Sequence, residues 1–118
     1  MERLRLQLSG PLSPAMLDER FAALSHRLKE RGSSATFALL IDARGLDFGT
    51  LRMEHGKVAL GWLRTLRPHM QGYEKEAFVH ERRSTRLLVA ASQKSVGLAR
   101  HCATFGELAS AERWLEIR

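Results

Sequence analysis

The clearest strand in this sequence is Phe37-Ala38-Leu39-Leu40-Ile41-Asp42. Its first five residues are all apolar and lack the alternation of a half-exposed strand, so we expect a central strand buried on both faces. Helix-forming sequence lies on both sides of it. Strands that alternate with amphipathic helices are typical of an α/β domain. We therefore predict a single domain over residues 1–118, with one mostly parallel sheet of four strands that helices cover.

Three further strands are expected. Leu4, Leu6 and Leu8 alternate with polar residues, which predicts a strand with one buried and one wet face. The apolar run 87–91 is interpreted as a second buried strand. Residues 104–106 are interpreted as a short final strand.

Four helices are expected between and after these strands. The first begins after Ser13, a good N-cap, and Thr50 is the expected cap of the second. Ser92 is the expected cap of a third helix that includes residues 96–102. The last helix is amphipathic over residues 108–115.

Residues 72–84 fit either of two structures. Tyr73, Ala77 and Phe78, which lie among charged residues, could form the apolar face of a short helix. Residues 77–79 could instead belong to a strand. The pattern leaves this choice open, because a short apolar run suits both structures.

The composition is that of an ordinary globular protein with a mild positive charge. Of the 118 residues, 44% are hydrophobic and 27% charged, which suits one core. The net charge of +6 selects no class of partner. The single cysteine, Cys102, cannot form an internal disulfide, which fits a reducing compartment. The sequence shows no signal peptide and no apolar stretch long enough to span a membrane, so we expect a cytoplasmic protein.

The most informative polar residues follow the central strand. Asp42 and Arg44 come at its carboxyl end, where open α/β sheets tend to bind ligands. The alternative for Asp42 is that it orders the turn by accepting backbone hydrogen bonds. Thr50 is a candidate phosphorylation site as well as a cap, since a phosphate is favoured at a helix N-terminus. With Asp47 and Arg52, these residues are our candidates for binding a partner.

No pattern in the sequence predicts an enzyme. The five histidines and Cys102 lack the spacing of a metal site, and no nucleophile–base pair or phosphate-binding loop is present. We therefore expect no catalytic residue, no metal and no cofactor. Arg82, Arg83 and Arg86 form the strongest basic cluster, which could grip phosphate groups. Glutamates interrupt this cluster and few aromatic residues lie near it, so nucleic acid is not the expected partner.

Three stretches carry a resemblance to a known family. They are residues 8–13 (Leu-Ser-Gly-Pro-Leu-Ser), residues 37–46, and residues 105–115, which end in Trp-Leu. Together they resemble a STAS-type domain, the family of anti-sigma-factor antagonists and of the cytoplasmic domains of sulfate transporters. The resemblance is closer to the small bacterial STAS-like proteins that are grouped with the lipid-binding Sec14 fold. Regulatory STAS domains carry a phosphorylatable serine within Asp-Ser-Ser-Gly, whereas residues 48–53 offer Thr50 alone and lack the glycine after it.

The resemblance implies a non-enzymatic regulatory module that binds another protein. We expect the partner to dock around residues 42–50 and on the helix that follows, with charged side chains such as Arg44, Asp47 and Arg52 giving orientation and specificity. A homodimer, formed through a helix or through the exposed edge of the first strand, is a further alternative. The Sec14-like side of the resemblance implies a second function, a carrier or sensor that binds a lipid or small apolar molecule between the helices and the sheet.

Overall fold

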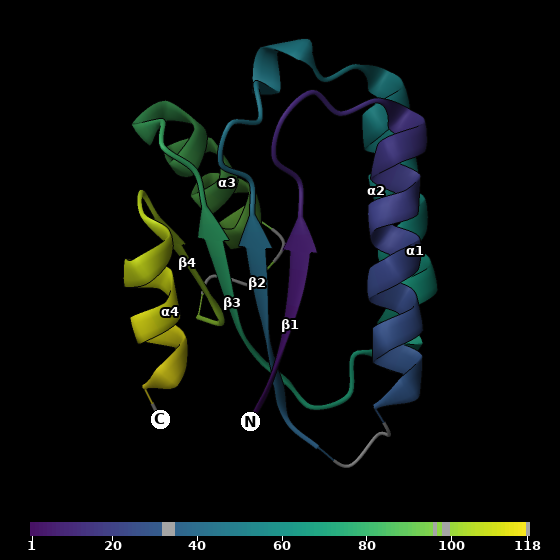
Figure 1. Cartoon of the computed structure of the whole chain (residues 1–118), viewed down its shortest axis with the longest axis vertical. Coiled ribbons are helices and arrows are strands. Elements are labelled where there is room, and N and C mark those ends of the chain that lie inside the picture. The colour runs from purple at the N-terminus through teal and green to yellow at the C-terminus, as the bar shows by residue number, and fades with distance from the viewer. Residues whose placement is uncertain (32–34, 96, 98–99, 118) are drawn as a thin grey trace.

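The computed structural model describes residues 1–31, 35–95, 97 and 100–117. In these residues, one four-stranded parallel sheet lies between helices (Figure 1). The strands, which follow one another across the sheet in chain order, are β1 (Glu2–Gln7), β2 (Phe37–Asp42), β3 (Tyr73–Val79) and β4 (Cys102–Phe105). The helices are α1 (Pro14–Glu30), α2 (Met53–Leu66), α3 (Arg83–Ser95) and α4 (Leu108–Glu116), with short 3-10 turns η1 (Phe48–Thr50) and η2 (Arg67–His69) on either side of α2. The predicted fold class, an α/β fold with a parallel sheet of four strands, is confirmed.

The sheet separates two apolar cores. Alternate side chains of each strand point to opposite faces, so neighbouring residues of β2 enter different cores. The larger core lies between the sheet and the α1–α2 pair and includes Leu4, Leu6, Phe21, Leu24, Phe37, Leu39 and Phe78. The smaller core lies under α4 and contains Ala38, Leu40, Ala77, Val79, Ala111 and Leu115. Figure 1 shows α1 and α2 standing together on one side of the sheet and α4 on the other.

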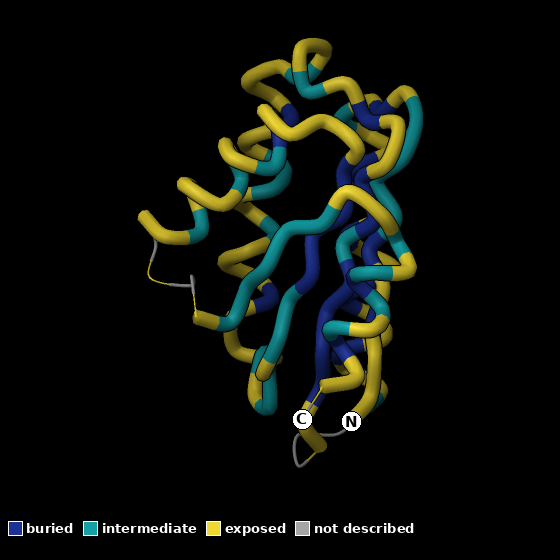
Figure 2. The backbone as a smooth tube through the Cα atoms, turned by 90° about the vertical axis from the view of Figure 1, so that its left-hand side faces the viewer, coloured by how far each residue is buried: buried dark blue, intermediate teal, exposed yellow. Residues whose placement is uncertain are grey.

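The predictions for β1, α1 and β2 are confirmed. Leu4 and Leu6 are buried while Arg5 between them is exposed, as expected of an edge strand with one wet face. The hydroxyl of Ser13 accepts the Met16 N–H at 3.1 Å and so caps α1. β2 is buried along most of its length, and in Figure 2 the buried tube runs through the middle of the molecule.

The interpretation of residues 87–91 as a strand is wrong. They lie within α3, and β3, which includes the alternative strand 77–79, takes the third place in the sheet. Leucine and alanine are strong helix formers, and only Val89 in this run is β-branched. Val89 packs on the larger core, whereas Leu87 and Leu88 are 61% and 60% exposed. Figure 2 shows most of α3 as exposed or half-buried tube.

The prediction of a third helix that begins after Ser92 and includes Cys102 is wrong at its start and at its end. Ser92 lies inside α3 and caps nothing, and Cys102 begins β4 instead of continuing a helix. Residues 96, 98 and 99 of that prediction lie outside the described residues. Gly97, with a φ of 79°, donates its N–H to the carbonyl of Lys94, as a glycine that follows a helix commonly does. Within the described ranges, no helix has both the length and the apolar character that crossing a bilayer requires.

Candidate functional site

The five residues predicted to bind a partner lie at the carboxyl ends of the strands and divide into two groups. Asp42 and Arg44 form an ionic cluster with Arg5 of β1. Asp47, Thr50 and Arg52 instead line a depression beside the start of α1. The two groups therefore need separate functional interpretations.

Asp42 is completely buried and is held by two arginines. Its Oδ1 accepts from Nε of Arg44 at 2.9 Å and its Oδ2 from Nη2 of Arg44 at 2.8 Å, which is a bidentate pair. Nη2 of Arg5 donates to Oδ2 at 2.6 Å, and Gln7 adds a weaker contact at 3.3 Å. The backbone N–H of Arg44 donates to Oδ1 at 3.2 Å. These donors occupy the lone pairs that a carboxylate offers.

These contacts determine the charge state of Asp42. Burial alone would raise the pKa of this carboxyl, but the hydrogen bonds from Arg44 and Arg5 outweigh burial and lower the pKa from 3.8 to about 2. Asp42 is therefore ionised at neutral pH and is a poor base. The geometry favours the alternative that Asp42 orders the turn, while the exposed side chains of Arg5 and Arg44 remain accessible to a partner.

The second group surrounds what we call the crest depression. It has a volume of about 580 Å³ and lies between the loop after β1 and the loop after β2. Its lining includes Leu12 and Met16 on one side and Asp47, Thr50 and Arg52 on the other. The depression thus combines apolar and charged side chains at the edge of the sheet where parallel α/β folds bind ligands.

Thr50 does not cap α2. It ends the turn η1, and α2 begins three residues later at Met53, with Arg52 at the N-cap position. The Thr50 hydroxyl donates to the backbone oxygen of Asp47 at 2.7 Å, and the carboxylate of Asp47 accepts the Gly49 N–H at 2.9 Å. The prediction of a cap is wrong because this tight local turn uses the threonine hydroxyl instead.

Two buried histidines brace the loops around this edge. Nε2 of His55 donates to the carbonyl of Leu12 at 2.6 Å, and Nδ1 accepts the backbone N–H of Arg52 at 2.9 Å. His80 repeats this arrangement, with Nε2 donating to Leu46 at 2.6 Å and Nδ1 accepting the N–H of Arg82 at 3.0 Å. Each ring therefore carries its proton on Nε2. Sequence reasoning missed both histidines, because Leu12 and Leu46 are distant from them along the chain.

Glu81 is another residue that sequence reasoning missed. Both oxygens of its carboxylate lie 3.1 Å from the backbone N–H of Gly45 and accept from it. A hydrogen bond from the backbone N–H of Glu81 itself, together with this contact with Gly45, lowers the pKa of the Glu81 carboxyl. Arg86, from the basic cluster, donates to the carbonyls of His80 at 2.8 Å and Glu81 at 3.1 Å. That arginine therefore fixes the β3–α3 turn, which leaves less of the cluster for phosphate groups.

A separate cavity lies under the α1–α2 pair, and we call it the inner cavity. It has a volume of about 230 Å³ and is bounded by α1, α2, β1, β2 and β3, with η2 close by. Its lining is apolar apart from one carboxyl group: Leu6, Phe21, Leu24, Leu28, Phe37, Leu39, Ile41, Leu63, Leu66, Met70 and Glu76. Leu63 is 58% exposed and so lies where the cavity reaches the surface. The sequence predicted a space between helices and sheet only through the Sec14-like resemblance.

Polar side chains of β3, α3 and β4 meet beside Glu76. Oε2 of Glu76 accepts from Gln93 at 3.1 Å and from the Cys102 thiol at 3.6 Å, and the Tyr73 hydroxyl lies 3.6 Å from the same sulfur. Burial raises the pKa of Glu76, and the hydrogen bonds only partly offset it. Burial likewise raises the pKa of Cys102 to about 11 and also raises that of Tyr73. The thiol is therefore poorly nucleophilic at neutral pH.

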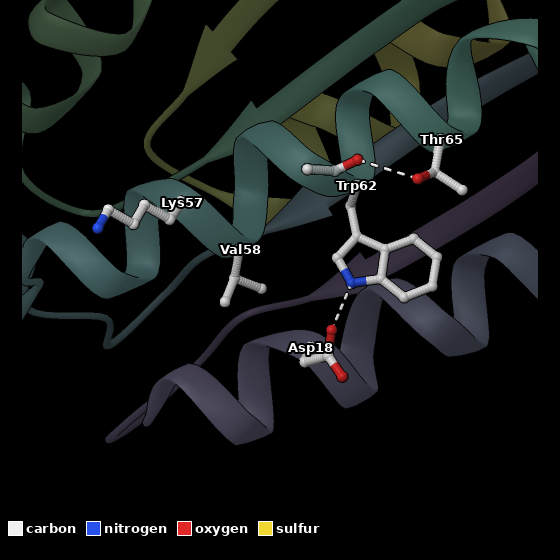
Figure 3. Close-up of a pocket in the computed structure, with 6 residues that line it drawn as sticks. Asp18, Lys57, Val58, Trp62 and Thr65 are labelled. Carbon is white, nitrogen blue, oxygen red and sulfur yellow. Dashed lines mark hydrogen bonds between the residues drawn. The ribbon is translucent and has the colours of Figure 1, made fainter.

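A third hollow is a shallow groove between α1 and α2 on the outer side of this helix pair (Figure 3). The Trp62 indole N–H donates to Asp18 of α1 at 2.7 Å, and the Trp62 ring stacks on Phe21 at a centroid distance of 6.3 Å. The Thr65 hydroxyl donates to the carbonyl of Gly61. Figure 3 shows the indole spanning the space between the two helices. Trp62 therefore joins α1 to α2 and forms part of the wall of this groove.

Comparison with protein-family models, with curated proteins and with solved structures finds no match for this chain. The resemblance to STAS-type domains thus stays a prediction based on the sequence. The crest depression and the inner cavity are the candidate binding sites of this chain.

Proposed function

We propose that this chain is a non-enzymatic regulatory module of the bacterial cytoplasm that binds a protein partner at the crest depression and the adjoining start of α2. The observation that carries the proposal is the meeting of three predicted contact residues, Asp47, Thr50 and Arg52, around one largely apolar depression. Interfaces of this kind gain affinity from buried apolar surface and specificity from charges at the rim.

The apolar part of this surface extends beyond the depression. Met53, the first residue of α2, is exposed, and Met16 of α1 is partly so. Methionine side chains adapt to the shape of a partner and are common at binding surfaces. A partner segment with several projecting apolar side chains would occupy the depression and cover these methionines.

The surface is also preorganised, because hydrogen bonds within the fold already hold its loops in place. His55 ties the loop before α1 to the start of α2, and Glu81 ties the turn at Gly45 to the end of β3. A surface that is ordered before binding loses less conformational entropy when a partner docks. This favours recognition by a preformed surface over folding on binding.

Phosphorylation of Thr50 is proposed as the control of this surface. A phosphate would remove the hydrogen bond from the Thr50 hydroxyl to Asp47 and add close to two negative charges beside the Asp47 carboxylate. The repulsion would loosen η1 and change the charge at the rim. We expect Thr50→Asp to weaken partner binding in the same direction as phosphorylation.

Reversing the charge at the rim tests the proposed function. We expect Arg52→Glu to lower partner affinity about tenfold, because a rim charge that faces an opposite charge becomes repulsive. The matched control is Arg64→Glu, the same change at an exposed position of α2 that does not line the depression. The measurement is capture of lysate proteins on the immobilised wild-type and variant chains at low and high salt. A protein retained equally by all three chains would contradict docking at the crest depression.

A second candidate function is the binding of a small apolar molecule, and the inner cavity favours it. A cavity of about 150 Å³ accommodates benzene in another protein, so 230 Å³ is enough for a ligand of about nine non-hydrogen atoms. The acyl chain of a membrane lipid is larger than this, which favours a small molecule over a lipid. Native mass spectrometry of the undenatured protein tests this function, and an added mass in the range of a small molecule is the expected result.

A further inference from the structure

The inner cavity has one chemical feature that a simple packing defect would lack. Among the described residues that line it, Glu76 is the single charged side chain and the rest are apolar. A carboxylate facing an apolar space loses hydration that its protein partners must replace. Here the partners are the amide of Gln93 and the weak thiol donor of Cys102, which both reach the same oxygen, Oε2, and the hydroxyl of Tyr73. None of these partners carries a positive charge.

Lys75 and His101, basic neighbours of Glu76 in the sheet, bind other groups. Lys75, the neighbour of Glu76 on β3, points to the opposite face of the sheet, where its ammonium donates to the carbonyl of Trp114 at 3.1 Å and lies 4.9 Å from the Trp114 ring centre. His101 directs Nδ1 to the carbonyl of Glu74 at 3.0 Å. No ion pair to Glu76 occurs within the part of the chain that the structure describes. The cavity thus offers a ligand an unneutralised carboxyl group.

We propose that the inner cavity binds a small primary amine with an apolar body, with the ammonium group on Glu76 and the apolar body among the leucines of α1 and the sheet. This inference rests on the second candidate function and names the class of its ligand. The ammonium supplies the charge and the strong hydrogen bond that Gln93 and Cys102 do not. The raised pKa of Glu76 agrees with a carboxyl that lacks a cationic partner.

The size and the entrance of the cavity limit which primary amines can bind. A volume of about 230 Å³ suits a single ring or a short branched chain, of about nine non-hydrogen atoms including the nitrogen. Leu63, exposed and at the cavity wall, lies on the route from solvent. An arylalkylamine such as 2-phenylethylamine has the required size and charge. Its alcohol analogue, 2-phenylethanol, has the same shape without the charge.

The test is an NMR titration of the full chain with these two compounds, following methyl signals of the cavity leucines. We expect the wild-type protein to bind the amine at least about tenfold more tightly than the alcohol, which corresponds to about 1.4 kcal/mol, since hydrogen bonds between charged groups are stronger than neutral ones. Glu76→Gln should reduce the amine affinity to that of the alcohol and change the alcohol affinity less than about twofold. Equal affinities of the two compounds for the wild-type protein would overturn the inference without any variant.

A pair of tryptophan substitutions on α2 locates the binding. Leu63→Trp should block the entrance and abolish binding of both compounds. Leu60→Trp, at a half-exposed position that does not line the cavity, should leave both affinities unchanged. Binding of both compounds with equal strength would reject the amine class while keeping the second candidate function. Binding of neither compound, or binding that Leu63→Trp leaves intact, would reject both.

Discussion

Substitution of Asp42 by asparagine is expected to destabilise the fold by about 2 kcal/mol at neutral pH. The pKa of this carboxyl falls from 3.8 in the unfolded chain to about 2 in the folded one, and each unit of pKa corresponds to about 1.4 kcal/mol. The difference of 1.8 units gives a little over 2 kcal/mol for ionised Asp42. Asparagine removes the charge and turns an NH₂ group toward Arg5 or Arg44, whose guanidinium groups are themselves donors. The cost should therefore be at least this large.

The contribution of Asp42 to the free energy of unfolding should also depend on pH. Because the folded pKa lies below the unfolded one, the contribution of Asp42 is complete above about pH 4 and is lost as the pH falls toward 2. The difference in unfolding free energy between the wild type and Asp42→Asn should shrink over the same range. Urea unfolding at a series of pH values measures it.

A conservative control separates this effect from a general response to loss of a carboxylate. Asp47→Asn keeps an oxygen that accepts the Gly49 N–H, and Asp47 is exposed, so its effect should stay within about 0.5 kcal/mol. The reasoning is refuted if Asp42→Asn also stays within 0.5 kcal/mol at pH 7. A large effect that does not change between pH 4 and pH 2 would show that packing, and not the ionic cluster, is responsible.

Three further predictions concern other parts of the molecule. Gly72→Ala should lower the free energy of unfolding by about 2 kcal/mol or more in urea, because φ is +85° and the added Cβ would lie 2.4 Å from the carbonyl oxygen of Ala35. Gly61→Ala, in α2 with open space around it, should instead raise the free energy of unfolding by about 0.5–1 kcal/mol. Cys102, whose pKa is raised to about 11, should react with iodoacetamide at pH 8 much more slowly in the folded protein than in urea, and equal rates would contradict its burial beside Glu76. His80→Phe should lower the free energy of unfolding by about 2 kcal/mol by leaving two backbone groups unpaired, and a neutral result would show that water replaces the ring.

Much of the fold could be predicted because its strongest signals are local. The unbroken apolar run of β2, the alternation of Leu4 and Leu6, and the Ser13 cap each determine the structure of their own segment. The run 87–91 could not be assigned in this way, because the periodicity of five apolar residues in a row does not distinguish a strand from a helix. Either residues 87–91 or residues 73–79 could form the third strand of the sheet, and the choice between them depends on contacts across the whole sheet.

The candidate site could be predicted only in part, for a similar reason. The order of strand and loop predicted Asp42, Arg44 and Asp47 at the carboxyl edge of the sheet. The grouping of Asp47, Thr50 and Arg52 around one depression is found in the structure. The burial of Asp42 depends on Arg5, which belongs to a different strand. The inner cavity depends on how far α2 stands from the sheet, and no local pattern reports a distance between elements.

The position of α4 has a consequence for how the protein is made. The first three helices precede β4, but α4 follows all four strands in the chain and alone covers Ala38, Leu40, Ala77 and Val79. A chain that ends before α4 can pair its strands in order once it is released, yet it leaves this apolar face uncovered. A released chain truncated at residue 107 should therefore be prone to aggregation, even though every strand of the fold is present.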